Sequence, residues 1–250
     1  MLKEMKNLIA FLTVIPVGMD QDYLTDAARY MSLFPLVGAF IGTLAGISAW
    51  LLHQILPDLI VGTLSLGSLL LITGLHHTDG LLDFGDGIMC QGPPGKKIEV
   101  MHDKQTGAGG LALGLITLLS TAFCIAGLKA NIVIQSLVVS EISAKLSMVV
   151  GAWTGKSAHK GMNTYFINAM HDRHRKAHLV IALTISFGIA TTSLWAMGFM
   201  AVISGTILGL IMVGISRRHF RGMTGDVFGA MNDLCRMASL IAIVALAKWA

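Results

Sequence analysis

Long apolar runs separated by short polar segments dominate the chain. Seven of them are long enough, at roughly 20 residues each, to cross about 30 Å of hydrocarbon as helices. The predicted spans cover residues 31–52, 59–78, 107–128, 131–152, 179–197, 198–215 and 237–249. Only the short sequence AMGFM separates the fifth span from the sixth, so six spans with one kinked helix are the alternative. The pattern predicts an all-α, polytopic integral membrane protein.

The first 18 residues, MLKEMKNLIAFLTVIPVG, differ from the spans because their apolar run is short. They lack a small-x-small cleavage site, and Pro16 interrupts the run. These features argue against a cleaved signal peptide and favour a retained interfacial or re-entrant helix.

Composition supports the membrane assignment, because 54% of the residues are hydrophobic and only 13% are charged, against about 25% charged in soluble proteins. The three cysteines have no paired spacing, which indicates neither a disulfide framework nor a zinc site. No linker rich in proline or serine divides the chain. We therefore expect a single domain over residues 1–250.

Lysine and arginine gather on one side of the predicted membrane. They concentrate in the loops 79–106, 153–178 and 216–236, whereas the other side has only Lys129 and Lys248. The positive-inside rule makes the basic side cytoplasmic. Such a face suits anionic lipid headgroups or an anionic substrate.

The segment GLHHTDGLLDFGDG, residues 74–87, carries the densest group of candidate catalytic residues. Asp79, Asp83 and Asp86 follow an i, i+4, i+7 spacing, which places them on one face of a helix. Three close carboxylates repel one another unless a cation or protons neutralise them, and Mg²⁺ prefers such oxygen ligands. The alternative is a solvated helix start with acids at the positive end of the dipole, which explains one or two aspartates but not three. His77 either joins this site or packs beside it.

Two further segments hold candidate ligands for phosphate. KKIEVMHDKQTGAGG, residues 96–110, offers Asp103 as a fourth carboxylate and a glycine-rich helix start whose N–H groups suit a phosphate. Lys96 is either a phosphate ligand or an ordinary inner-side lysine. RRHFRGMTGDVFGAMND, residues 217–233, adds arginines and spaced acids. The phosphate- or substrate-binding candidates from the two segments are Lys96, Gly107, Arg221, Asp226, Asn232 and Asp233.

One charged pair lies inside a predicted span. Glu141 and Lys145 are four residues apart in the fourth span. Charges within a membrane are costly unless they are paired, so we expect a structural ion pair with a possible role in the site.

Five blocks of sequence resemble one known family. HTDGLLDFGDG (77–87) resembles the signature H-x-D-G-x-x-D-x-x-D-G of the cobalamin synthases, the adenosylcobinamide-GDP ribazoletransferases of the cell membrane. FLTVIPVG (11–18), LFPLVGAFIG (33–42), the 96–110 segment and MTGDVFGAMND (223–233) agree with the family in the same order. The similarity spans nearly the whole chain but is thin over residues 153–215.

The resemblance implies a reaction and its participants. Adenosylcobinamide-GDP and α-ribazole, or its 5′-phosphate, would give adenosylcobalamin, or its 5′-phosphate, and GMP, with Mg²⁺ as cofactor. The metal ligands would be Asp79, Asp83 and Asp86, joined by Asp103, and one of the aspartates or His77 would accept a proton. The partners would be the corrinoid nucleotide, α-ribazole and membrane lipids, without nucleic acid; the sequence does not indicate an oligomeric state.

Two positions depart from the family pattern. Gln105 stands where the family has an arginine, so a phosphate contact there would either be weaker or be supplied by Lys104. Asp233 replaces a glutamate and keeps the charge.

Two other functions were weighed. A CDP-alcohol phosphotransferase also has spaced aspartates on membrane helices, but its motif requires an aspartate where this chain has His76 and Ala-Arg where it has Asp83 and Phe84. An ion or metal transporter would place its acids near the bilayer midplane, where only Glu141 is expected.

Overall fold

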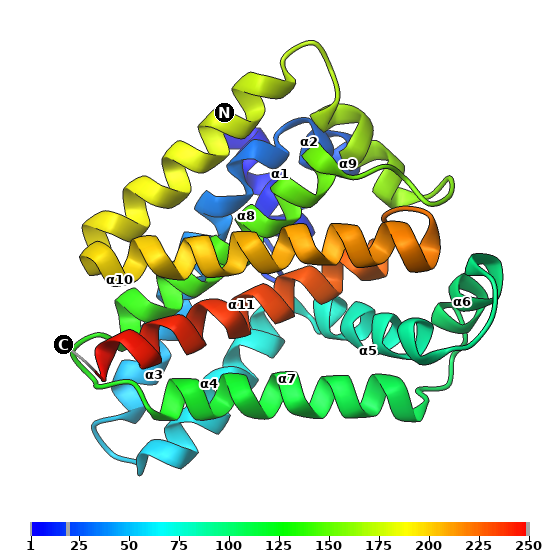
Figure 1. Ribbon diagram of the computed structural model, residues 1–250. Helices are drawn as coiled ribbons and strands as arrows, with labels where there is room; N and C mark the ends of the chain where they lie inside the picture. The colour runs from blue at the N-terminus through cyan, green and yellow to red at the C-terminus, as the bar shows by residue number, and fades with distance from the viewer. Residues whose placement is uncertain (1, 19–20, 249–250) are drawn as a thin grey trace.

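The computed structural model of the protein describes residues 2–18 and 21–248, and helices account for nearly all of its regular structure (Figure 1). The helices are α1 (Leu2–Leu12), α2 (Tyr23–Arg29), η1 (Met31–Leu33), α3 (Phe34–Leu52), α4 (Asp58–Thr73), α5 (His76–Met89), α6 (Pro94–Met101), α7 (Ala108–Ala126), α8 (Val133–Thr154), α9 (Met162–Met170), α10 (Arg175–Phe220) and α11 (Gly225–Ala247). No β-strand occurs in the described ranges. The predicted all-α fold is confirmed.

Five helices are long and apolar enough to cross a membrane among the residues that the structure describes. They cover Met31–Leu52, Ala108–Ala126, Val133–Thr154, Arg175–Phe220 and Gly225–Ala247, and a sixth span arises if α4 and α5 count as one bent span. The protein is therefore a multi-pass membrane protein, and the predicted total of seven spans is not established. Helix α8 lies at the centre, packed against α3, α10 and α11.

The predicted boundary between the fifth and sixth spans coincides with a kink in α10. Leu194 and Trp195 leave the helical region of φ/ψ space, and Trp195 has a φ of 51°. The two halves of α10 form a V that opens from this point (Figure 1). Two helical segments therefore meet at the predicted boundary between the fifth and sixth spans.

The second predicted span, 59–78, was wrong at its end, because α4 stops at Thr73. Gly74 and Leu75 both adopt left-handed backbone conformations, with φ of 68° and 64°, and α5 leaves α4 at 98°. The backbone N–H of Val14 donates to the Ile72 carbonyl over 2.9 Å at this break. Mean hydropathy does not reveal such a break, since apolar residues continue through it.

The last predicted span, 237–249, also began too late. Helix α11 starts at Gly225 behind Thr224, whose hydroxyl accepts the Val227 backbone N–H at 3.2 Å, and residue 249 lies outside the described residues. Arg236, assigned from the sequence to a basic loop, is instead within α11 and 1% exposed. The charged residues of this stretch pair with one another inside the bundle, so their presence did not end the helix.

The two ends of the bundle differ in their loops. The connections between α5 and α6, α6 and α7, α8 and α9, and α10 and α11 lie toward the right of Figure 1, whereas the α9–α10 connection, which carries part of the basic loop 153–178, lies at the top. The α3–α4 and α7–α8 connections lie at the lower left. The assignment of all three basic loops to one side of a membrane stays a prediction.

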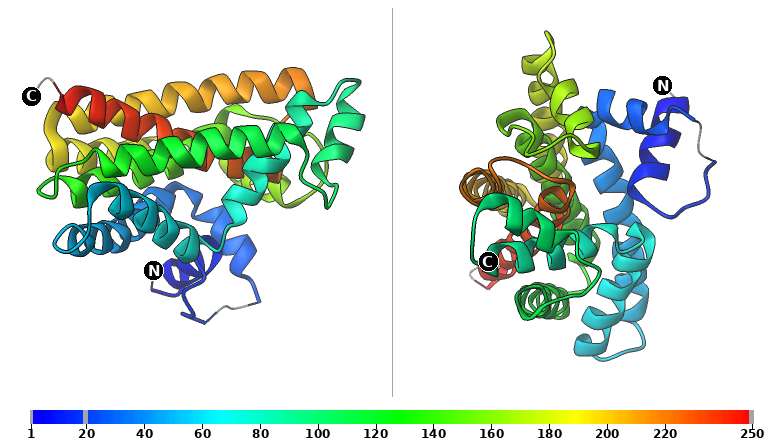
Figure 2. Two further views of the ribbon diagram at one scale, coloured as in Figure 1. Left: turned by 90° about the horizontal axis from the view of Figure 1, so that it is seen from below. Right: turned by 90° about the vertical axis from the view of Figure 1, so that its right-hand side faces the viewer.

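Helices α1 and α2 lie at one side of the long helices (Figure 2). Helix α1 has 11 residues, too few to cross a bilayer, and its Asn7 amide donates to Asp26 of the α2 segment at 2.8 Å. Its position at the membrane interface stays a prediction.

Candidate active site

The site is built where α5 crosses α11 with the two backbones in contact. A Cβ atom on Gly80 would lie 2.9 Å from the Cα of Asp226, and one on Gly229 would lie 2.9 Å from the His77 carbonyl oxygen. Glycine at both crossing points permits this approach, as small residues do between membrane helices. The crossing brings the first turn of α11 beside the first two turns of α5.

Three carboxylates meet at this crossing: Asp79 and Asp83 from α5 and Asp226 from α11, together named the acidic cluster. Asp79 is exposed, and Asp83 and Asp226 are half-buried. The negative charges of Asp226, Asp79 and Asp86 all act on the Asp83 carboxylate. Such a group repels itself unless a cation balances it.

The acidic cluster fits Mg²⁺ in one particular way. Among the described residues, no three histidine, cysteine, aspartate or glutamate side chains lie close enough to bind one ion together. Mg²⁺ commonly keeps several water ligands and binds through one or two carboxylates plus substrate phosphate oxygens. The carboxylates present therefore suit an ion shared with a phosphate, and not a site closed by protein alone.

Asp86 faces a different partner from the acidic cluster. Its two carboxylate oxygens accept the backbone N–H groups of Gly107 at 2.7 Å and Gly110 at 2.8 Å, and the side chain is 8% exposed. These N–H groups open α7, so Asp86 caps that helix from 21 residues away. The Gly107 N–H predicted for a phosphate already has a carboxylate partner.

The remaining residues predicted from the 96–110 segment lie at the surface. Asp103 and Lys104 are exposed, and Asp103 accepts the Gln105 backbone N–H at 3.3 Å. Within the described ranges, Asp103 forms no hydrogen bond or ion pair with the acidic cluster. Lys96 is exposed on α6, and Arg221 is exposed at the turn between α10 and α11.

Asn232 and Asp233 are buried one to two turns further along α11. Asp233 accepts hydrogen bonds from the Thr78 hydroxyl at 2.8 Å, from Arg236 Nη1 at 2.7 Å and from Asn232 Nδ2 at 2.9 Å. The bond from Thr78 ties α5 to α11 directly behind the acidic cluster. The structure thus places these two predicted substrate ligands in a packed interior.

The same interior contains the pair predicted from the fourth span. Lys145 Nζ lies 3.7 Å from Glu141 Oε2, which confirms the expected ion pair. Arg236 donates to Glu141, and Lys145 donates to Asn232. The buried network joins α5, α8 and α11 through Thr78, Glu141, Lys145, Asn232, Asp233 and Arg236.

A cavity of about 410 Å³ opens beside the acidic cluster. Asp79 and Asp226 line it on one side, and Phe11, Phe34 and Phe166 line it on the other. The phenylalanines come from α1, α3 and α9, so no single motif could reveal the wall that they form.

His77 lies on the same cavity. It is 8% exposed, and its Nδ1 atom has no hydrogen-bond partner in the structure as described. His77 is therefore packed against α11 but leaves its Nδ1 atom without a protein partner among the described residues.

Sequence reasoning missed two polar residues near the site. His102 acts electrostatically on Asp226 and contacts the His159 ring edge-on, with centroids 5.7 Å apart. Lys97 Nζ donates to the Cys90 carbonyl at 2.6 Å at the end of α5. His102 directly precedes the predicted metal ligand Asp103 in the sequence, and this adjacency is the signal that could have identified it.

Comparisons with known proteins agree on one family. The sequence model described as "Cobalamin-5-phosphate synthase" matches residues 4–244. A protein of Methanocella arvoryzae named adenosylcobinamide-GDP ribazoletransferase is 37% identical over 96% of this chain and 94% of its own. Proteins with the same name from Methanococcoides burtonii and Thermococcus kodakarensis are each 31% identical, over 96% and 98% of this chain and 90% and 99% of their own. No solved structure matches the chain.

Proposed function

Because the chain belongs to the cobalamin-5-phosphate synthase family, we propose that this transferase joins adenosylcobinamide-GDP to α-ribazole, or to α-ribazole 5′-phosphate, with release of GMP. The product is adenosylcobalamin or its 5′-phosphate. The observation that carries the proposal is the acidic cluster, in which Asp79 and Asp226 line one cavity and both act electrostatically on Asp83. This arrangement suits a pyrophosphate substrate and an accompanying cation.

The reaction is a transfer at phosphorus. The ribazole 3′-hydroxyl oxygen forms a bond to the phosphorus carried by cobinamide, and the bond from that phosphorus to the bridging oxygen breaks. GMP leaves with the bridging oxygen, and the hydroxyl proton passes to a base. Positioning and neutralisation of charge supply most of the catalysis in such transfers.

The residues have distinct roles in this proposal. One or two carboxylates of Asp79, Asp83 and Asp226 would hold Mg²⁺ against the pyrophosphate, and the bound ion would supply charge neutralisation. The unpartnered His77 or one of these aspartates accepts the hydroxyl proton. Lys96, Lys104 and Arg221, exposed at the same end, are available to the outer phosphate or to lipid.

The location is part of the proposal. Basic loops surround the end of the bundle that carries the acidic cluster, which favours a cytoplasmic active face in the cell membrane. The deep carboxylate Glu141 is paired with Lys145 and Arg236, so it offers no free site to a translocated ion. This pairing favours the enzyme over a transporter.

Purified protein in lipid vesicles tests the reaction. Adenosylcobinamide-GDP and α-ribazole are supplied together and singly, with Mg²⁺ or with EDTA, and GMP and corrinoid product are measured. We expect both products in equal amounts, only with both substrates and Mg²⁺. Absence of corrinoid product in every condition would overturn the proposal.

A further inference from the structure

The cavity beside the acidic cluster has an aromatic wall. The ring centroids of Phe11 and Phe166 are 5.2 Å apart, those of Phe34 and Phe166 are 5.9 Å apart, and those of Phe11 and Phe34 are 6.1 Å apart. Their mutual contacts hold the rings in place, and all three border the cavity. A flat aromatic ligand would find ring faces and edges at the distances typical of aromatic pairs.

Besides His77, Asp79 and Asp226, the polar side chains among the described residues that line the cavity are Tyr23, His76 and Asn163. Asn163 lines it, but its Nδ2 donates to Ser157 Oγ at 2.7 Å and to the Met223 carbonyl at 2.8 Å. The side chains of Met31 and Met148 are apolar and are also part of the lining. A ligand edge with several donors and acceptors would therefore lose hydrogen bonds to water here without replacing them.

One buried polar atom in the lining does lack a partner. His77 is more than nine-tenths buried, and its Nδ1 is without a hydrogen bond in the described structure. Buried polar atoms are nearly always paired, so an orphan nitrogen on a cavity wall indicates a bound polar atom. A ligand that presents one or two polar atoms on a flat apolar body matches this arrangement.

The cavity is of the size that holds a small ligand. A corrin, a macrocycle with several amide side chains, is too large to enter it whole. Guanine would fit by size, but its edge carries several donors and acceptors for which Phe11, Phe34 and Phe166 offer no partners. The benzimidazole base of a ribazole has an apolar body and one free ring nitrogen.

We propose that this cavity is the binding site for the benzimidazole base of the acceptor nucleoside, enclosed by Phe11, Phe34 and Phe166. The ribose then extends toward Asp79 and Asp226, where its hydroxyl meets the phosphate. The inference rests on the proposed function and adds to it the residues that select the acceptor.

Kinetics of a Phe166→Ala variant test the assignment. Loss of one ring face should raise the KM for α-ribazole by roughly tenfold, in line with base–aromatic stacking energies. The KM for adenosylcobinamide-GDP should stay within about twofold, because the corrinoid lies elsewhere. Equilibrium dialysis with α-ribazole alone should give the same rise in Kd without any turnover.

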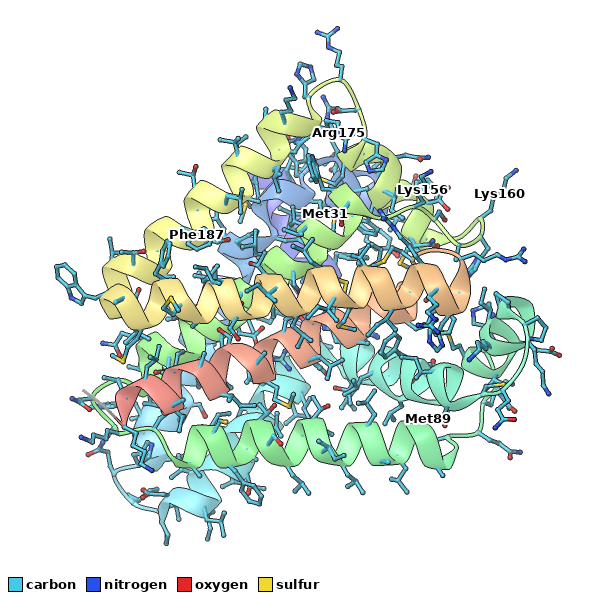
Figure 3. All side chains as sticks on the ribbon, viewed as in Figure 1. Met31, Met89, Lys156, Lys160, Arg175 and Phe187 are labelled. Atoms are coloured by element: carbon cyan, nitrogen blue, oxygen red, sulfur yellow. The ribbon has the colours of Figure 1, made fainter. Side chains whose placement is uncertain are left out.

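A second variant tests the assignment independently, in case Phe166→Ala does not fold. A Cβ on Gly225, which lines the cavity, would meet no atom within 4 Å. Gly225→Val therefore fills the cavity without a clash, and it should raise the KM for α-ribazole by a similar factor. Phe187→Ala is the matched control, since Phe187 pairs with Phe199 on α10 and is absent from the cavity lining (Figure 3).

The outcomes separate the two proposals. Unchanged KM and Kd for α-ribazole in both cavity variants, or a rise confined to adenosylcobinamide-GDP, would overturn the cavity assignment while leaving the reaction standing. Displacement of α-ribazole by GMP at equal concentration would assign the cavity to guanine and would overturn it as well. Binding of α-ribazole by wild-type protein that forms no corrinoid product would instead contradict the proposed reaction.

Discussion

Identical side chains in one short motif have different surroundings. Asp83 faces Asp79 and Asp226, whereas Asp86, three residues later, caps the start of α7 through Gly107 and Gly110. The spacing correctly places the aspartates on one helix. It does not indicate which carboxylate stays free, because the N–H groups that bind Asp86 come from a segment 21 residues away.

Replacement of Asp86 by alanine separates the capping role from a metal role. The N–H groups of Gly107 and Gly110, of which only the second is buried, would lose their acceptor, which should lower the free energy of unfolding by about 1–3 kcal/mol. Thermal unfolding in detergent measures this loss. The Mg²⁺ concentration for half-maximal GMP release should not change, and a large rise in that concentration at unchanged stability would make Asp86 a metal ligand.

At the level of elements, two features hold α5 in place, and the sequence reveals them to different extents. The break at Gly74–Leu75 turns α5 by 98° away from α4, and hydropathy alone does not reveal it. The buried network behind α5 was visible only in part. The Glu141–Lys145 spacing predicted an ion pair, but Arg236 was assigned to a loop. Its partners are Glu141 on α8 and Asp233, which lies one turn earlier on α11.

Removal of the Arg236 charge should be severe. Arg236→Met leaves Glu141 and Asp233 buried with one fewer cation, and breaking buried pairs in this way costs about 3–5 kcal/mol. We expect loss of folded protein on size-exclusion chromatography in detergent. Arg173→Met, the same change at an exposed loop position, should have no effect; equal stability of the two variants would contradict the role of the network.

At the scale of the whole molecule, the distribution of lysine and arginine gave the prediction of membrane orientation, which no single motif provides. The lysines and arginines are concentrated in three segments, of which the parts at the α5–α6, α8–α9 and α10–α11 connections lie toward the right of Figure 1 and the α9–α10 part lies at the top. The pattern could not show that residues 11, 34 and 166 enclose one cavity with α5 and α11, because that depends on how α1, α3 and α9 pack. Hydrophobic periodicity predicts the helices, whereas family membership indicates the reaction and the packing of the helices shows which residues enclose the cavity.

Thiol labelling tests the orientation of the whole molecule. Cys90 lies at the end of α5, beside the basic segments, and Lys129 lies in the α7–α8 connection at the other end. In cells, a membrane-impermeant maleimide should label a Lys129→Cys variant that lacks the native cysteines. It should label Cys90 only after the membrane is opened, and the reverse pattern would place the acidic cluster outside.

The central claim is that the acidic cluster holds Mg²⁺ against the pyrophosphate of the substrate. The most direct test is Mg²⁺-dependent GMP release by Asp83→Asn, compared with Asp58→Asn, a matched change at the exposed start of α4. We predict a loss of roughly hundredfold or more for Asp83→Asn, with folding in detergent intact, and full activity for Asp58→Asn. Wild-type turnover with the same Mg²⁺ dependence in Asp83→Asn would contradict the account.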